Sequence, residues 1–116
     1  MVKVILSGSN SSTMKVIENA WGREEILVQT DGYSLKRIYI KEEEQTPLKY
    51  HKVKKKTLFL EKGFADLVVN GTKWLMHKDK PYTINSEDVH RLIAYKDSVI
   101  LEVSTCEVED DYYHNV

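Results

Sequence analysis

The Asn70-Gly71 pair is the sequence feature that most constrains the fold of this chain. Both central residues of a type I′ turn need a positive φ angle, which Asn and Gly tolerate better than other residues. The pair stands between two short apolar-rich runs, residues 65–69 and residues 72–76. The sequence therefore predicts a β-hairpin that turns at Asn70-Gly71.

Short runs of this kind recur along the chain. Residues 33–40 alternate apolar and polar side chains as a half-buried strand does. Helical periodicity is confined to residues 13–20, a short candidate next to the helix breaker Gly22. Short strands bounded by turn residues are typical of an all-β barrel or sandwich. The other expected strands are residues 25–30, 48–53, 57–60, 81–84, 91–95 and 99–103.

Composition excludes several classes of protein. The 116 residues are enough for one domain that buries a core without disulfides or a structural metal. The net charge of -1 argues against a nucleic-acid partner. A single cysteine, Cys106, excludes an internal disulfide framework and fits a cytoplasmic protein. With no long apolar run and no signal peptide at the start, we expect no membrane partner.

Two stretches of the sequence are similar to the paired motifs of cupins. Residues 50–63 resemble the first motif, which carries two histidines, a glutamate and a closing glycine. Residues 82–92 resemble the second motif, which supplies one more histidine. Together with residues 21–25, 101–104 and 109–111, they resemble the phosphomannose isomerase domain of type II mannose-6-phosphate isomerase and of bifunctional mannose-1-phosphate guanylyltransferase.

The resemblance implies an antiparallel double-sheet β-barrel, or jelly roll, which agrees with the expected strands. We expect one cupin domain over residues 1–116, with a core at about residues 20–105. Residues 7–13 and the acidic tail after Val103 are the expected irregular ends.

The first cupin motif places its metal ligands by strand geometry. Two histidines one residue apart point to the same face of a strand, so both enter the barrel. With a carboxylate and a third histidine they form a site suited to zinc, iron or manganese. The resemblance assigns two of these positions to His51 and His90, whereas Val53 stands at the second histidine and Lys56 at the glutamate. We therefore expect no bound metal and no other cofactor.

Lys56 has two interpretations. If it points into the barrel beside His51 and His90, the pocket receives an anion, because lysine is a point-charge partner for phosphate and histidine adds a donor or a second charge. An anion would then bind more tightly as the pH falls through the histidine range near about 6.5. Alternatively, Lys56 turns outward with Lys54 and Lys55 as the solvated end of a hairpin.

The remaining roles follow from the resemblance. His51 and His90 are the candidate catalytic residues, as bases that move a proton between adjacent carbons. Lys56 and Arg91 are candidate substrate-binding residues that could polarise a carbonyl. Trp21 either stacks on a sugar ring or plugs the edge of the barrel.

The sequence supports two functions. The first is a small stand-alone cupin, resembling mannose-6-phosphate isomerase, that binds a phosphosugar or nucleotide-sugar in carbohydrate metabolism. Because Val53, Lys56 and His114 replace functional residues of the family, isomerase activity would be altered or lost. The second is a non-catalytic cupin that senses a ligand or serves in assembly, its pocket closed by Val53, Leu58 and Ile84. In both cases we expect a homodimer, because a free sheet edge needs cover.

Overall fold

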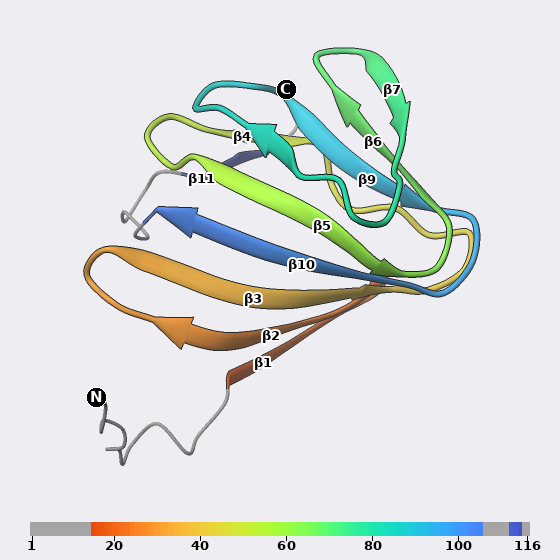
Figure 1. Cartoon of the computed structure of the whole chain (residues 1–116), viewed down its shortest axis with the longest axis horizontal. Coiled ribbons are helices and arrows are strands. Elements are labelled where there is room, and N and C mark those ends of the chain that lie inside the picture. The colour runs from red at the N-terminus through yellow and green to blue at the C-terminus, as the bar shows by residue number, and fades with distance from the viewer. Residues whose placement is uncertain (1–14, 106–111, 115–116) are drawn as a thin grey trace.

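A computed structural model describes residues 15–105 and the backbone of residues 112–114. They form two antiparallel sheets, with the strand orders β1-β2-β3-β10-β5-β8 and β11-β4-β9-β6-β7 (Figure 1). This described part contains no helix, and so none that could cross a membrane. The strands are β1 (Lys15–Asn19), β2 (Gly22–Gln29), β3 (Tyr33–Ile40), β4 (Lys49–His51), β5 (Lys56–Lys62), β6 (Ala65–Val69), β7 (Thr72–Leu75), β8 (Tyr82–Ile84), β9 (His90–Ala94), β10 (Ser98–Thr105) and β11 (Tyr112–His114).

The predicted hairpin is confirmed. Val69 of β6 pairs with Thr72 of β7, so the turn consists of Asn70 and Gly71 alone. Their φ angles are 49° and 86°, both positive as a type I′ turn requires. In Figure 1 this hairpin lies at one end of the second sheet.

The core lies between the two sheets and follows the two-residue period of the strands. Along β10, for example, Ile100 is buried while its neighbours Val99 and Leu101 are only half-buried. β10 is central to the first sheet because it pairs with β3 on one side and β5 on the other. The buried apolar side chains are Ile38, Ile40, Leu58, Leu60, Ala65, Leu67, Met76, Ile84, Leu92, Ala94 and Ile100. The all-β, double-sheet prediction is therefore confirmed.

The one short helix candidate, residues 13–20, does not form a helix where the structure describes it. Its described part forms the edge strand β1, which pairs with β2 from Lys15↔Ile26 to Asn19↔Gly22. The turn into β2 needs a glycine, because a Cβ atom at Gly22 would lie only 1.8 Å from the carbonyl oxygen of Tyr39. Pairing with β2 satisfies the backbone of a segment too short to form a stable helix alone.

The expectation of an irregular end after Val103 is also wrong in part. β10 continues to Thr105, and residues 112–114 form β11, which pairs with β4. The predicted loop at residues 7–13 and the thiol of Cys106 lie outside the described residues.

Candidate functional site

Charged side chains point into the barrel from neighbouring strands of the first sheet. Lys36 of β3 lies directly opposite Glu102 of β10, and both belong to the inward-facing set. Lys56, the first residue of β5, pairs with Ser104, two residues further along β10. Diagonal neighbours of this kind are within reach of long side chains. The sheet therefore gathers several charges inside the barrel, where charges are costly unless paired.

Glu102 is the centre of this cluster. Its side chain is 2% exposed, and its oxygens lie 3.4 Å from Nζ of Lys56, 3.6 Å from Nζ of Lys54 and 3.8 Å from Nζ of Lys36. Lys36 has a second partner, because its Nζ lies 3.1 Å from Oε1 of Glu24. All three distances to Glu102 exceed those of a short charge-assisted hydrogen bond. Glu102 is thus one carboxylate shared among three ammonium groups.

The contacts between Glu102 and the three lysines determine which of these groups are charged. Burial alone would raise the pKa of Glu102, but Lys56, Lys36 and Lys54 hold it well below its usual range. Burial lowers the pKa of Lys56 to about 7; Glu102 opposes this shift, and the neighbouring lysines add to it. Glu102 therefore stays ionised at neutral pH, whereas Lys56 changes between its charged and neutral forms near neutral pH.

The two predicted histidines meet on the opposite sheet. His51 ends β4 and His90 begins β9; both side chains are buried, and their ring centroids are 6.0 Å apart. Nδ1 of His90 lies 2.8 Å from the carbonyl oxygen of Asp88. A carbonyl can only accept, so Nδ1 carries the proton and Nε2 of His90 is left as an acceptor. Within the described residues, this buried Nε2 has no hydrogen-bond partner.

The environment keeps His90 neutral. Burial and the nearby charge of Lys56 lower its pKa to about 3, against the smaller effect of the bond to Asp88. A group with so low a pKa is a weak general base near neutral pH. His90 is therefore suited to accept a hydrogen bond, and the expected gain of charge near about 6.5 does not apply to it.

A small cavity separates these groups. Its volume is about 10 Å³, which is close to the space one water molecule needs. Lys56, His90 and Glu102 line it, and the half-buried residues Trp21 and Lys49 form its side toward solvent. The cavity as it stands excludes a sugar ring.

The structure separates the predicted site residues into two groups. Lys56 is 4% exposed and lies inside the barrel with His51 and His90, so the outward interpretation of Lys56 is wrong. Trp21 packs against the core and also lines the cavity. Its stacking on a sugar ring stays a prediction. Arg91 does not join them. It alternates with buried His90 along β9, and its Nε donates a 3.1 Å hydrogen bond to the carbonyl oxygen of Thr46.

The prediction that Val53 closes the pocket is also wrong. Its side chain is 60% exposed, so it neither faces the cavity nor closes it. Residues 52 and 53 form a bend between β4 and β5, where the alternation of a strand does not apply. Leu58 and Ile84 are buried as expected, and they belong to the apolar core.

Sequence reasoning missed Lys36, Lys54 and Glu102. For two of them a signal was present: Lys36 shares the parity of Ile38 and Ile40 on β3, and Glu102 shares that of Ile100 on β10. A charged residue in step with core residues is an inward-facing candidate. Lys54 lies outside any strand, so no periodicity could have placed it.

The donors inside the barrel do not fit a divalent cation. Residues 15–105 contain no group of three histidine, cysteine, aspartate or glutamate side chains able to hold one. Two imidazoles alone make an incomplete site, and Glu102 already faces three ammonium groups. A cation here would also lie close to Lys56, which repels it.

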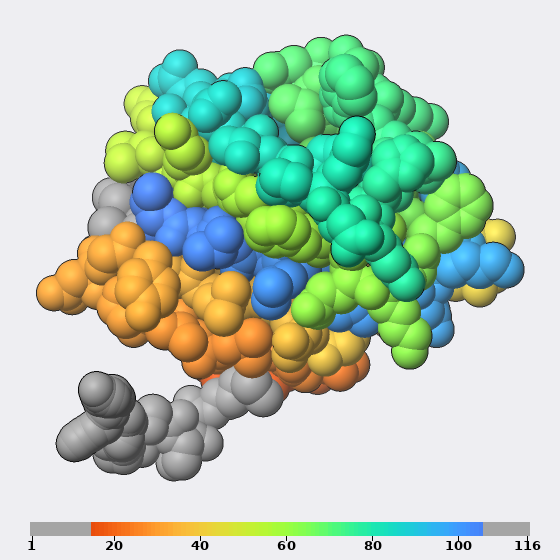
Figure 2. Space-filling model, viewed as in Figure 1, coloured from red at the N-terminus to blue at the C-terminus, as the bar shows by residue number. Residues whose placement is uncertain are grey.

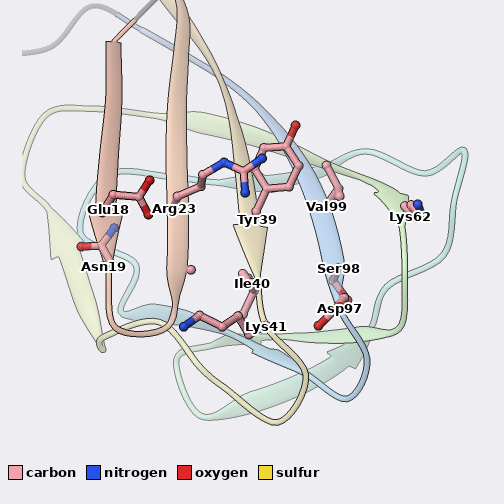
Figure 3. Close-up of a pocket in the computed structure, with 11 residues that line it drawn as sticks. Glu18, Asn19, Arg23, Tyr39, Ile40, Lys41, Lys62, Asp97, Ser98 and Val99 are labelled. Carbon is pink, nitrogen blue, oxygen red and sulfur yellow. The ribbon is translucent and has the colours of Figure 1, made fainter.

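A second hollow, of about 430 Å³, lies on the outer face of the first sheet (Figure 3). The guanidinium of Arg23 lies 3.8 Å above the centre of the Tyr39 ring. Glu25 binds both partners, at 3.2 Å from Nε of Arg23 and 3.2 Å from the hydroxyl of Tyr39. Because these groups satisfy one another and Arg23 covers the aromatic face, this hollow is less suited to a ligand.

The sequence matches a known protein family over most of its length. Residues 8–114 match the family described as the mannose-6-phosphate isomerase C-terminal domain. No curated protein matches the sequence.

Solved structures share the fold at low sequence identity. An RmlC-like cupin from Shewanella frigidimarina is 11% identical with a TM-score of 0.75, over 88% of this chain and 92% of that one. Streptomyces Pac13 with uridine is 12% identical with a TM-score of 0.76, over 95% and 91%. The capsular polysaccharide assembling protein CapF from Staphylococcus aureus is 13% identical with a TM-score of 0.75; the match covers 88% of this chain but 31% of CapF.

Proposed function

Because the chain belongs to the mannose-6-phosphate isomerase C-terminal family of cupins, we propose that its barrel binds the negatively charged group of a phosphosugar or nucleotide-sugar. Isomerase activity is altered or lost. The observation that carries the proposal is the position of Lys56, which is buried and shares its carboxylate partner, Glu102, with Lys36 and Lys54. An incoming anion would compensate the charge of Lys56, which shares its carboxylate partner with other ammonium groups.

The unpaired ring nitrogen of His90 supports a ligand that carries hydroxyl groups, such as a sugar, in addition to its anionic group. Nε2 of His90 is a buried acceptor without a hydrogen-bond partner among the described residues, and such an atom costs free energy until it is paired. A sugar hydroxyl is a donor of the right kind. Lys56 and His90 both line the cavity, and because it holds only about one water molecule, the binding of one ligand by both groups requires the lining side chains to move apart.

The size of the cavity argues against the family's isomerisation. With about 10 Å³ available, the sugar ring must stay on the solvent side of the cavity, near Trp21 and Lys49. Moving a proton between adjacent carbons of the opened sugar needs a base close to both. Lys56 has a pKa near neutrality and would suit such a base, but it lies at the floor, where the anionic group binds. We therefore propose binding in the absence of a metal, with weak isomerisation or none.

The nearly closed cavity favours a second candidate, a non-catalytic module for ligand sensing or assembly. In that case the lysines and Glu102 would only stabilise the barrel. CapF, described as a capsular polysaccharide assembling protein, has the same fold in part of its longer chain. Assembly through a homodimer remains a prediction, which light scattering in solution would check.

Calorimetry with mannose 6-phosphate, free mannose and inorganic phosphate tests the proposal. We expect mannose 6-phosphate to bind more tightly than mannose, and Lys56→Met to weaken it at least about tenfold, or about 1.4 kcal/mol. Lys55→Met is the matched control, because Lys55 is exposed beside Lys56 and should change nothing. Equal binding of the two sugars, or equal effects of the two variants, would favour the non-catalytic module.

A further inference from the structure

A third hollow opens between the edge strands of the two sheets, β7 and β8. Its volume is about 530 Å³, and its walls include Leu67, Trp74, Lys80, Tyr82 and Thr83. We propose that this β7–β8 cleft binds a sugar ring that carries one anionic group, a carboxylate or a phosphate, with the ring stacked on Trp74 and the anionic group at Lys80. This site is separate from the barrel cavity and does not rest on the function proposed for it.

Trp74 lies on the core-facing side of its sheet but is not covered. It pairs directly with Leu67, and directly paired residues share a face. Leu67 is fully buried, whereas Trp74 is 55% exposed. The first sheet ends at β8, a strand of only three residues, so its edge is short. Figure 2 shows the green β6–β7 hairpin beside the teal segment that leads into β8. An indole face is thus left open toward the cleft.

The opposite wall is held in place. The backbone N–H of His77, just after β7, donates a 2.8 Å hydrogen bond to the hydroxyl of Tyr82 on β8. Tyr82 also pairs with the core residue Leu58 on β5. The bond joins the two edges of the cleft and orients the Tyr82 ring. A wall fixed before binding lowers the entropic cost of holding a ligand.

Size and charge indicate the class of ligand. A hollow of this volume falls in the range of small-molecule sites, roughly 300 to 1,000 Å³, and such sites combine apolar and aromatic walls with a few polar groups. Of the described residues that line it, Lys80 alone is charged. Trp74 offers an apolar platform for the C–H face of a pyranose, and its indole N–H is a donor. A carboxylate or a phosphate on that ring would pair with Lys80.

Nuclear magnetic resonance can follow the indole N–H signal of Trp74, identified by its loss in Trp74→Phe. We expect D-glucuronate and glucose 6-phosphate to shift this signal saturably, and neutral glucose to bind at least about fivefold more weakly. The two anions distinguish a carboxylate from a phosphate as the preferred charge. Lys80→Ala should weaken the better anion at least about fivefold by this signal, and Trp74→Ala, which lacks the signal, should do so by calorimetry.

Three controls keep the test specific. Lys78→Ala, in the same loop but outside the cleft, and Leu75→Ala, the neighbour of Trp74 on β7, should leave affinity unchanged. Lys56→Met should also leave the affinity unchanged; a loss of affinity in this variant would show that the anion binds in the barrel cavity and would overturn the proposal.

Failure of both anions to shift the Trp74 signal would also overturn the proposal. Tighter binding of uridine monophosphate would assign the cleft to a nucleobase, and signals that shift with protein concentration alone would assign it to a second copy of the chain.

Discussion

Nζ of Lys56 lies 3.4 Å from Oε1 of Glu102, inside the barrel and between two neighbouring strands of the first sheet. Taking two charges out of water costs several kcal/mol for each ion, and a single pair repays this only with good geometry. Here the carboxylate also faces Lys36 and Lys54, so its charge is well compensated while that of Lys56 is not. This asymmetry makes the cluster a candidate binding site and has measurable consequences for stability.

Removing the shared carboxylate should be costly. Glu102→Gln keeps the shape of the side chain but leaves buried ammonium groups without their common partner. We expect it to lower the free energy of unfolding by about 3 kcal/mol at neutral pH, as breaking a buried ion pair does. Urea unfolding measures the change.

The matched control is Glu61→Gln. Glu61 forms an exposed ion pair with Arg37, at 2.9 Å, on the same sheet. An exposed pair contributes about 0 to 1 kcal/mol, so this variant should unfold almost as the unchanged protein does. Similar losses for both variants would mean that the Glu102 cluster contributes no more than a surface pair.

Lys56 should make the protein more stable as the pH rises. Its pKa is lowered to about 7 in the folded state, so the unfolded chain binds more protons above neutral pH. Stability therefore increases from about pH 7 to about pH 9, by at most about 1.4 kcal/mol per pH unit. Lys56→Met should remove this slope. A slope that persists in the variant, or a fall in stability over this range, would show that Lys56 keeps an ordinary pKa.

His90 should remain neutral in mildly acidic solution. Its pKa is lowered to about 3, and its Nδ1 proton is bound by the carbonyl oxygen of Asp88. Nitrogen-15 resonances of the ring should therefore show the Nδ1–H tautomer unchanged from about pH 8 to about pH 5. Titration of the His90 ring within this range would contradict its burial.

Much of the fold could be predicted because its signals are local. Asn70-Gly71 specifies its turn through backbone preferences alone, and residues 33–40 show the strand period directly. The edge strands β1 and β11 could not be predicted in this way. Each is short and gains its backbone hydrogen bonds by pairing with β2 or β4, which is a tertiary effect.

The site could be predicted only in part for the same reason. The motifs identified His51, His90 and Lys56 as site residues, and all three are buried inside the barrel. Arg91 was misplaced because the strand period was not applied to it, although His90 next to it fixes which face it takes. The partner of Lys56 is Glu102, 46 positions away on a strand that joins β5 only in the folded sheet (102 − 56). Sequence spacing gives no information about such a pair.

The pH dependence of affinity for mannose 6-phosphate tests the central claim most directly. Between about pH 9 and about pH 7 the phosphate keeps both charges, because its second pKa is near about 6, so changes in affinity report on the protein. If protonated Lys56 holds the phosphate, affinity should rise as the pH falls toward about 7, by at most about tenfold per pH unit, and Lys56→Met should abolish the rise. An affinity that is constant over this range in the unchanged protein, or that rises equally in Lys56→Met, would contradict a phosphate site at Lys56.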